Sequence, residues 1–301
     1  MDKDETEAIK ACYDSWAVTY HDEYLGPKAG YPPVHIELVR TIVRGHGCRI
    51  LLDAGCGPAS MVRALVSDVD HIFGFDLSQG MIDEARRIAS GHGMSADNLW
   101  VGDARDPSAY VDPRGTAPSS FDGLLSIGVL PHISDDDQGR VLSNSFAALR
   151  PGGIALFQAR NELFSLFTFN RYSRDFFFEK LVSPEIHERA KAGDAEVQGA
   201  LKELDSFFRT DLPRRRIGVG KTPGYDEIRS RLHNPFTLCQ AAEAAGFRDV
   251  RPHFYNFCCL PPMFAARFPA VFQSASLALE DPESWTGYFM APAFIVSGIR
   301  P

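Results

Sequence analysis

The stretch ILLDAGCGPAS, residues 50–60, contains the residues of this chain best suited to bind a nucleotide. Apolar residues lead into Asp53, and Gly55 and Gly57 follow with one residue between them. A turn that wraps a ligand needs glycine, because a Cβ would clash with the tight backbone or with the ligand. We therefore expect a ligand-binding turn directly after a short buried strand.

This turn departs from the fingerprint of a dinucleotide-binding loop in two ways. The pattern G-x-G-x-x-G would place a third glycine at position 60, where the chain has Ser60. Asp53, two residues before the first glycine, would repel a pyrophosphate and attract an ammonium group. The combination favours a nucleoside ligand with a cationic end and no phosphate, a description that S-adenosylmethionine fits.

Two further acids end the next two apolar segments. Asp76 follows the glycine turn by about 20 residues, where a carboxylate can accept hydrogen bonds from both ribose hydroxyls, as it also does in NAD sites. Asp103, in the segment VGDA, is placed to approach an adenine amino group. The alternative is that Asp76 caps a helix and Asp103 caps a turn. The two acids therefore indicate a ligand that contains a nucleoside, but they do not distinguish S-adenosylmethionine from NAD.

A histidine after the next apolar segment is the candidate for catalysis. If the ligand is S-adenosylmethionine, the expected reaction is methyl transfer, which needs an acceptor lone pair in line with the sulfonium carbon; a hydroxyl acceptor also needs a base within hydrogen-bond reach. His132, in VLPHI, is the predicted base because imidazole titrates near neutral pH; its alternative role is to pack or cap the following helix. His233 and His253 are secondary candidates for contact with the substrate, although we favour a core position for His253.

The elements that would position these residues alternate between strand and helix. Short apolar runs at 48–54, 71–76, 98–104, 121–127 and 153–159 predict strands, and amphipathic stretches at 60–69, 78–90 and 134–150 predict helices. This alternation indicates right-handed βαβ units and a parallel sheet covered by helices on both faces.

Two segments flank or interrupt the alternating pattern. Residues 1–45 are predicted to form a helical cap, in which Trp16, Tyr20 and Tyr24 make an aromatic stripe along one helix. Residues 46–160 and 234–301 are predicted to form the nucleoside-binding core. Residues 161–233 are too many for an ordinary connection, so we expect an inserted substructure that serves as a substrate lid.

The predicted lid carries a basic loop, PRRRIGVGK, that could hold an anionic group of a substrate. Flexible basic side chains bind phosphate or carboxylate. The alternative is a solvated basic run that balances nearby acids. The candidate substrate-binding cations are Arg160, Arg171, Arg214, Arg215, Arg216 and Lys221.

Composition narrows the class of protein and its partners. The chain has 301 residues and a net charge of −8, which argues against nucleic acid as a partner. No apolar run is long enough to cross a bilayer, and the charged start of the sequence does not resemble a signal peptide. The six cysteines have no C-x-x-C spacing, so we predict no metal site. A cytoplasmic protein is expected.

Taken in order, the motifs resemble those of class I S-adenosylmethionine-dependent methyltransferases that act on small molecules. The resemblance rests on LLDAGCG, FGFDLSQGMIDEAR, VGDA, FDGLLSIGVLPHI and LRPGGIALF, with YDSWAVTYHDEY similar to the N-terminal aromatic cap. It implies a doubly wound, mostly parallel seven-stranded sheet, the Rossmann-like methyltransferase fold. The N-terminal cap and a helical lid between the fifth and sixth strands complete the expected architecture.

The resemblance also assigns residues to parts of the cofactor. Asp53, Gly55 and Gly57 would line its methionine end, and Asp76 would hold the ribose. The segment that contains Ile127 would face the methyl group. Tyr13 and Tyr20 would close over the cofactor, with Tyr13 also on the substrate side. The residues expected near the adenine are Leu77, Met81, Asp103 and Ala104.

The predicted function is transfer of a methyl group to a hydroxyl of a small or mid-sized, anionic metabolite, with S-adenosyl-L-homocysteine as product. Sugars, nucleotide sugars and secondary-metabolite scaffolds all fit. The alternatives are N-methylation of a small amine and a non-catalytic module that binds the cofactor. A base-modifying nucleic-acid enzyme is disfavoured, because SIGVLPHI stands where an Asn/Asp-Pro-Pro-aromatic motif would lie. The expected partner is a small-molecule substrate, and a homodimer is left open.

Overall fold

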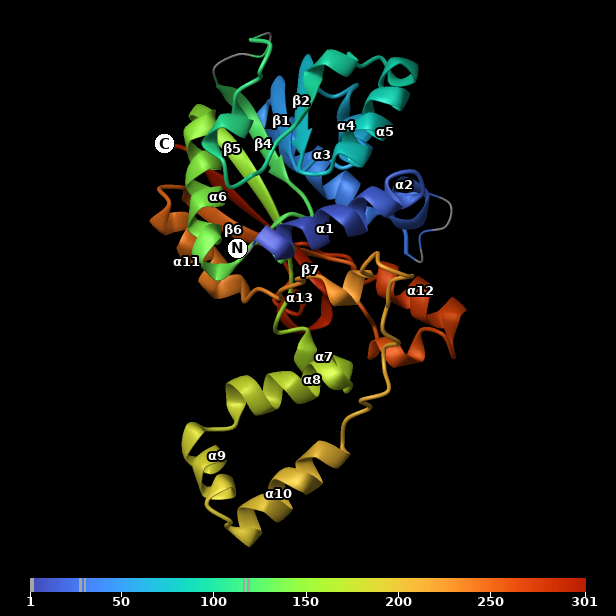
Figure 1. Cartoon of the computed structure of the whole chain (residues 1–301), viewed down its shortest axis with the longest axis vertical. Helices are drawn as coiled ribbons and strands as arrows, with labels where there is room; N and C mark the ends of the chain where they lie inside the picture. The colour runs from blue at the N-terminus through green and yellow to red at the C-terminus, as the bar shows by residue number, and fades with distance from the viewer. Residues whose placement is uncertain (1–2, 27–28, 30, 116, 118–119) are drawn as a thin grey trace.

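A single seven-stranded sheet forms the centre of the molecule (Figure 1). The computed structural model describes residues 3–26, 29, 31–115, 117 and 120–301. The strands lie in the order β3-β2-β1-β4-β5-β7-β6, and β7 runs antiparallel to both of its neighbours while the other pairs are parallel. The predicted seven-stranded, mostly parallel sheet is therefore confirmed. The strands are β1 (Ile50–Ala54), β2 (His71–Asp76), β3 (Leu99–Val101), β4 (Phe121–Ser126), β5 (Leu149–Arg160), β6 (Arg248–Tyr255) and β7 (Ala293–Ile299).

Helices cover both faces of the sheet. Val39 of α3 and Ile82 of α5 belong to one buried apolar cluster, whereas Leu142 of α6 and Leu238 of α11 belong to another. No helix within the described ranges is both long and apolar enough to cross a membrane. The helices are α1 (Lys3–Trp16), α2 (Tyr20–Tyr24), α3 (Val34–His46), α4 (Ser60–Leu65), α5 (Gln79–Ala89), α6 (Asp135–Ala148), α7 (Ser165–Thr168), α8 (Arg171–Phe176), α9 (Pro184–Lys191), α10 (Ala195–Ser206), α11 (Pro235–Ala244), α12 (Pro269–Leu277) and α13 (Gly287–Met290).

Short helical turns complete the connections. Two of them bear on the site: η4 (Leu130–His132), which follows β4, and η6 (Tyr225–Glu227), at the end of the insertion. A π-helical turn, η5 (Phe177–Leu181), extends α8. The others are η1 (Ser90–His92), η2 (Ala96–Asn98), η3 (Pro107–Tyr110) and η7 (Pro262–Phe264).

The chain reverses its direction of winding between β1 and β4. Strands β2 and β3 are added on one side of β1, and β4 and β5 on the other. In such sheets the crevice for a ligand lies beyond the carboxyl ends of the strands at this switch point. The turn after β1, the end of β2 and the turn η4 therefore face the same crevice.

The aromatic stripe of the N-terminal cap lies on two helices and not on one continuous helix. A turn at residues 17–19 separates α1 from α2, so the expected i, i+4, i+8 stripe does not run along a single helix. Its aromatic rings still meet: Trp16 contacts Tyr24 edge-on, with centroids 5.9 Å apart, and Tyr20 stacks on Tyr24 at 4.8 Å. Asp14 ties α1 to α5, because its Oδ1 accepts hydrogen bonds from the hydroxyl of Ser78 and, at 3.0 Å, from the backbone N–H of Gly80.

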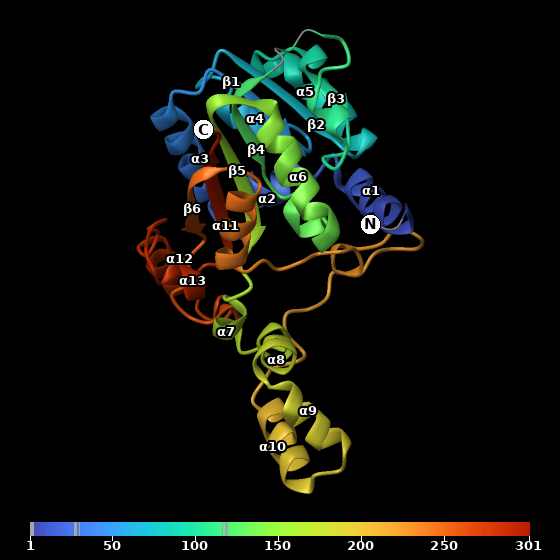
Figure 2. The same ribbon diagram turned by 90° about the vertical axis from the view of Figure 1, so that its left-hand side faces the viewer.

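The segment 161–233 leaves the sheet after β5 and returns before α11. Its two ends are joined by backbone hydrogen bonds, from His233 N–H to the Arg160 carbonyl at 2.7 Å and from Glu162 N–H to the His233 carbonyl at 2.9 Å. Helices α7 and α8 lie next to the sheet domain, whereas α9 and α10 extend farthest from it in both views (Figure 2). None of these 73 residues, all of which are described, adds a strand to the sheet.

Asp122 fixes the start of β1 against β4 and generates a stability prediction. Its carboxylate accepts hydrogen bonds from the backbone N–H groups of Arg49 and Ile50 at 2.9 and 3.0 Å, and also contacts Arg150. Replacing Asp122 with Ala leaves these donors without their acceptor. We expect the free energy of unfolding in urea to fall by about 1–3 kcal/mol.

The exposed Asp97 is the matched control, because its only ion pair among the described residues is with Arg114 on the surface. Asp97→Ala should change the free energy of unfolding by less than about 0.5 kcal/mol. Equal effects of the two substitutions would contradict a special role for Asp122.

Candidate functional site

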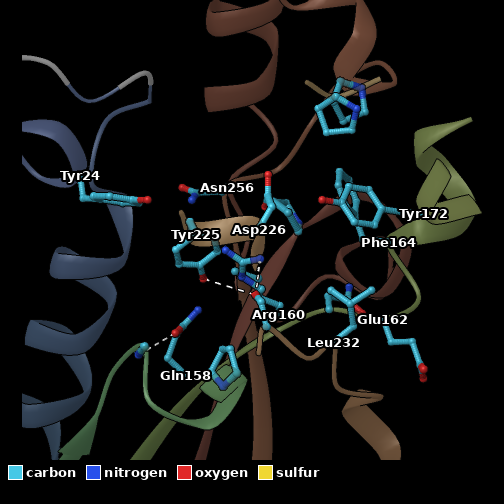
Figure 3. Close-up of a pocket in the computed structure, with 18 of the residues that line it drawn as sticks. Tyr24, Gln158, Arg160, Glu162, Phe164, Tyr172, Tyr225, Asp226, Leu232 and Asn256 are labelled. Carbon is cyan, nitrogen blue, oxygen red and sulfur yellow. Dashed lines mark hydrogen bonds between the residues drawn. The ribbon is translucent and has the colours of Figure 1, made fainter. Parts of the chain in front are cut away.

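Two adjoining cavities open at the carboxyl ends of β1, β2 and β4. The larger has a volume of about 1110 Å³ and extends from the glycine turn to α7 and α8 of the insertion (Figure 3). The smaller lies over the ends of β2 and β3. Both are lined by Tyr13, Tyr20, Gly55, Gly57, Ile127 and Gly128, so these residues mark the junction. An elongated molecule that occupies the smaller cavity would reach the larger one at this junction.

The glycines of the turn are required by its geometry. Gly55 has φ = +87°, and a Cβ there would lie 2.1 Å from Cγ2 of Val129. Gly57 has φ = +53°, and its Cβ would point into open space. Glycine adopts positive φ without the penalty that other residues incur. The turn therefore has no side chains at Gly55 and Gly57, the positions where its backbone lines both cavities.

Asp53 is a buried carboxylate that lacks a complete set of hydrogen bonds. Its side chain lines the larger cavity, the residue is 1% exposed, and Oδ1 has no partner among the described residues. Burial, with a smaller contribution from the charge of Asp76, raises the pKa of Asp53 to about 8. A cationic group in the cavity would reduce this energetic cost by pairing with the carboxylate.

Asp76 connects β2 to the glycine turn. Its Oδ2 accepts a hydrogen bond from Gly57 N–H at 2.8 Å, and Oδ1 accepts one from Ser78 N–H at 2.9 Å. Burial raises the pKa of Asp76 to about 6, although these backbone donors oppose the increase. A carboxylate has about four acceptor positions, so two remain for ligand hydroxyls. The side chain lines the smaller cavity with Leu77, Met81, Asp103 and Ala104.

Asp103 lies in the smaller cavity but is already paired. Its carboxylate accepts hydrogen bonds from Arg105 Nε at 2.9 and 3.0 Å, and from the Arg105 backbone N–H at 2.9 Å. Arg105 also lines this cavity and reaches Thr6 of α1 at 3.3 Å. Any contact of Asp103 with an adenine edge must therefore coexist with this ion pair.

His132 and Tyr13 form a hydrogen-bonded pair at the junction of the cavities. His132 Nδ1 lies 2.5 Å from the Arg229 carbonyl, and Nε2 lies 2.7 Å from the Tyr13 hydroxyl. Because a carbonyl can only accept, Nδ1 carries the proton, and Nε2 accepts the hydrogen bond that the Tyr13 hydroxyl donates. Burial lowers the pKa of His132 to about 4, partly opposed by the Arg229 carbonyl, so the ring is neutral at pH 7.

The basic residues predicted from the sequence divide into two groups. Arg160, Arg171, Arg214 and Arg215 line the larger cavity, and none of them forms an ion pair with a carboxylate in the described part of the chain. Arg160 instead donates a hydrogen bond to Ser230 at 2.9 Å and lies over the ring of Tyr225, 4.7 Å from its centroid. Arg216 pairs with Asp226 and covers the same ring at 4.2 Å.

Four of the predicted substrate residues do not line either cavity: Arg216, Lys221, His233 and His253. His253 lies on β6 and hydrogen-bonds Ser297 of β7 at 2.9 Å. His233 is buried where the insertion rejoins the core, and neither of its ring nitrogens has a partner among the described residues.

Several cavity residues were not identified by sequence reasoning. Gln158 accepts a hydrogen bond from Gly128 N–H at 2.8 Å, and the only signal for it is a polar residue inside an apolar strand. Tyr225 and Asn256 also line the larger cavity, and the Arg229 carbonyl contacts His132; all three come from segments that carry no recognisable motif. They reach the site only through tertiary folding. In the described part of the chain no three His, Cys, Asp or Glu side chains are grouped to hold a metal ion.

These residues fit S-adenosylmethionine. The unpartnered Asp53 oxygen can receive the ammonium of its methionine end, and Asp76 can receive its ribose hydroxyls. The bare Gly57 leaves space for the ligand, and Leu77 and Met81 supply apolar walls for the adenine. When bound, this cofactor supplies an electrophilic methyl group.

The fold and the site define a class of protein, and a family comparison agrees with it. Residues 51–153 match a family described as a methyltransferase domain. Residues 51–153 therefore form a methyltransferase domain, and the chain as a whole has the Rossmann-like methyltransferase fold.

Individual relatives are more distant. The chain is 28% identical over 156 residues to a protein of unknown function from Synechococcus, covering 50% of this chain and 36% of that protein. It is 22% identical over 164 residues to ubiquinone biosynthesis O-methyltransferase from Actinobacillus pleuropneumoniae, covering 52% and 65%. The chain thus spans less than two thirds of these relatives.

A solved structure with a similar fold is phosphoethanolamine N-methyltransferase 2 from Haemonchus contortus, in complex with S-adenosyl-L-methionine. The TM-score is 0.51 at 17% identity, and the alignment covers 96% of this chain and 57% of that one. At this level of identity the similarity describes the fold.

Replacement of the buried Asp53 should change both the affinity for the cofactor product and the pH dependence of protein stability. Asp53→Asn removes the charge that would pair with an ammonium, so the affinity for S-adenosylhomocysteine in calorimetry should fall about 10- to 100-fold. The ligand-free variant should also lose less stability than the wild type as pH rises from about 4 to about 8. In that interval the folded wild type retains a proton that the unfolded chain releases, because the folded-state pKa is raised.

The matched control is Asp83→Asn, which changes an exposed acid on α5. It should leave both the affinity and the pH dependence of stability unchanged. Unaltered binding of S-adenosylhomocysteine by Asp53→Asn would contradict the proposed position of the ammonium.

Proposed function

We propose that this protein transfers a methyl group from S-adenosylmethionine to a hydroxyl of a small, anionic acceptor with an apolar body. The single observation that carries the proposal is the Tyr13–His132 pair at the junction of the two cavities. A methyl donor that extends from the smaller cavity would present its reactive carbon at this junction. An acceptor in the larger cavity would approach it from the opposite side.

His132 is the proposed base and acts through Tyr13. Tyr13 lines both cavities, and its hydroxyl donates a hydrogen bond to His132 Nε2. As the acceptor oxygen bonds to the methyl carbon, its proton passes to the Tyr13 oxygen, and the Tyr13 proton passes to Nε2. The Arg229 carbonyl accepts a hydrogen bond from Nδ1–H throughout, and so stabilises the imidazolium that forms. When bound, S-adenosylmethionine would supply the methyl group, and the electron pair of the broken sulfur–carbon bond would stay on sulfur to give S-adenosylhomocysteine.

The charge of the acceptor follows from the arginines of the larger cavity. Arg160 lies in this cavity without a carboxylate partner in the described part of the chain. A partly buried guanidinium gains most from a bidentate carboxylate or phosphate. Arg171, Arg214 and Arg215 also line this cavity and add positive charge to it. An acceptor with one anionic group is therefore preferred to a neutral one.

The body of the acceptor would contact the inserted segment, which we propose as the lid. Phe164 and Phe176, of the α7–α8 region, line the larger cavity with Leu232. Figure 3 shows Phe164, Tyr172 and Leu232 together on one side of the cavity, with Arg160 between this group and Gln158. This arrangement suits a ring or chain that is apolar on one side and carries the anionic group near Arg160.

Replacement of His132 tests the proposed base. His132→Gln should lower the rate of S-adenosylhomocysteine formation about 100- to 10,000-fold, because general base catalysis is lost, while cofactor affinity changes less than about twofold. Since the ring is neutral above its pKa of about 4, the wild-type rate should fall as pH decreases through that value and not near 6.5. The assay uses 3,4-dihydroxybenzoate as acceptor, because it combines a carboxylate, an apolar ring and hydroxyls.

His92→Gln is the matched control, since His92 is exposed in η1, directly after α5, and should not affect the rate. An unchanged rate in His132→Gln would remove this residue from the mechanism. Normal cofactor binding without turnover of hydroxybenzoates, hydroxycinnamates or sugar phosphates would favour the alternative of a non-catalytic binding module.

Replacement of Arg160 tests the charge of the acceptor. Arg160→Gln should weaken binding of 3,4-dihydroxybenzoate to the cofactor-loaded protein about 10- to 100-fold, but should leave binding of the neutral catechol unchanged. Arg248→Gln, at an exposed position on β6, is the control. An equal loss of affinity for 3,4-dihydroxybenzoate and for catechol would show that Arg160 shapes the cavity but does not recognise the negative charge of the acceptor.

A further inference from the structure

One wall of the larger cavity carries polar atoms that neither the cofactor site nor the proposed base explains. It is formed by His35 of α3 together with Tyr255 and Asn256 at the end of β6. Figure 3 shows Asn256 beside Tyr24, across the cavity from Phe164 and Tyr172. We call these three residues the His35–Asn256 wall.

His35 contributes a ring nitrogen that is shielded from solvent. Its Nδ1 has no hydrogen-bond partner among the described residues. The ring stacks on Tyr255 with centroids 5.3 Å apart and an interplanar angle of 30°, which fixes its orientation. Burial lowers the pKa of His35 to about 4, so the imidazole is neutral and can donate from one nitrogen.

Asn256 contributes a shielded carbonyl oxygen, held by a strained backbone. Its Oδ1 also has no partner in the described part of the chain. The residue has φ = +63°, a left-handed conformation that costs most residues energy, although it costs asparagine and aspartate less than the others. Backbone strain of this kind persists only where surrounding contacts enforce it, and it is concentrated at functional sites.

Glu280 provides those contacts. Its carboxylate accepts hydrogen bonds from the backbone N–H groups of Asn256 and Phe257, the latter at 2.8 Å. It also accepts one from the Tyr31 hydroxyl at 2.8 Å. Tyr31 precedes α3, the helix that carries His35. A half-buried carboxylate thus supports both sides of the His35–Asn256 wall.

We propose that the His35–Asn256 wall is a second polar subsite that binds a hydroxyl of the acceptor other than the one that is methylated. A hydroxyl can donate to Asn256 Oδ1 and accept from His35 Nδ1–H, and so satisfies both unpartnered atoms with one group. A subsite of this kind suits a hydroxyl better than a second anion, since the neutral His35 imidazole and the Asn256 amide supply no positive charge. This inference rests on the proposed function and narrows the acceptor to an anionic compound with at least two hydroxyls.

The test compares two probes that differ by one hydroxyl. Binding of 3,4-dihydroxybenzoate and of 4-hydroxybenzoate to the protein loaded with S-adenosylhomocysteine is measured by calorimetry. Wild-type protein should bind the dihydroxy compound about five- to tenfold more tightly. Asn256→Gly, which tolerates the left-handed backbone, and His35→Phe, which keeps the stacking on Tyr255, should each abolish this preference.

A conservative substitution and a measurement of cofactor affinity together show whether His35 and Asn256 bind the acceptor or only maintain the structure. Asn256→Asp retains an oxygen acceptor in a residue type that tolerates left-handed geometry, and should keep at least half of the preference. In all three variants the affinity for S-adenosylhomocysteine alone should change less than about twofold. Failure of the wild type to prefer 3,4-dihydroxybenzoate, or an undiminished preference in both Asn256→Gly and His35→Phe, would overturn the subsite.

The cofactor measurement distinguishes this inference from the proposed function. A large loss of S-adenosylhomocysteine affinity in Asn256→Gly or His35→Phe would assign the wall to the methionine end of the cofactor and overturn the acceptor subsite alone. Absence of S-adenosylhomocysteine binding by the wild type would instead overturn the proposed function.

Discussion

The site depends on a carboxylate that is buried without a matching charge. Asp53 ends the central strand β1, is almost completely shielded, and has an oxygen that no described residue satisfies. Placing a charged group there is unfavourable in the ligand-free protein, and the rise in its pKa reflects this cost. A cationic ligand group relieves it, so the fold maintains a preformed, energetically unsatisfied site for one particular end of the cofactor. The bare glycines and Asp76 then determine how the rest of that ligand lies.

The groups that form the proposed base come from three separate parts of the chain. The cap brings Tyr13, the turn after β4 brings His132, and the return segment of the insertion brings the Arg229 carbonyl that orients the imidazole. Arg229 also pairs with Glu5 of α1, and Arg231 donates to the Ile133 carbonyl at 2.8 Å. The insertion is therefore connected to the base as well as to the larger cavity. We infer that a movement of the insertion would alter the orientation of His132 together with access to the acceptor.

The sequence could predict the parts of this structure that local patterns encode. The alternation of apolar strands and amphipathic helices predicted the sheet, and the glycine spacing with Asp53 and Asp76 predicted a nucleoside turn, because backbone conformation and strand order leave little freedom there. Side chains brought together by long-range folding were harder to predict. The unpaired state of Arg160, the pairing of Asp103 with Arg105, and the strained Asn256 depend on neighbours distant in the sequence. The break between α1 and α2 also followed from tertiary packing, since the aromatic spacing alone suited one helix.

We infer that Asp53 and the glycine turn that follows it recognise the amino-acid end of S-adenosylmethionine. The most direct measurement compares, by calorimetry on the wild-type protein, S-adenosylhomocysteine with 5′-methylthioadenosine, which keeps the nucleoside and lacks the amino-acid group. The account predicts that S-adenosylhomocysteine binds at least about 100-fold more tightly, because only it places an ammonium beside the buried carboxylate. Equal affinities for the two compounds would contradict it.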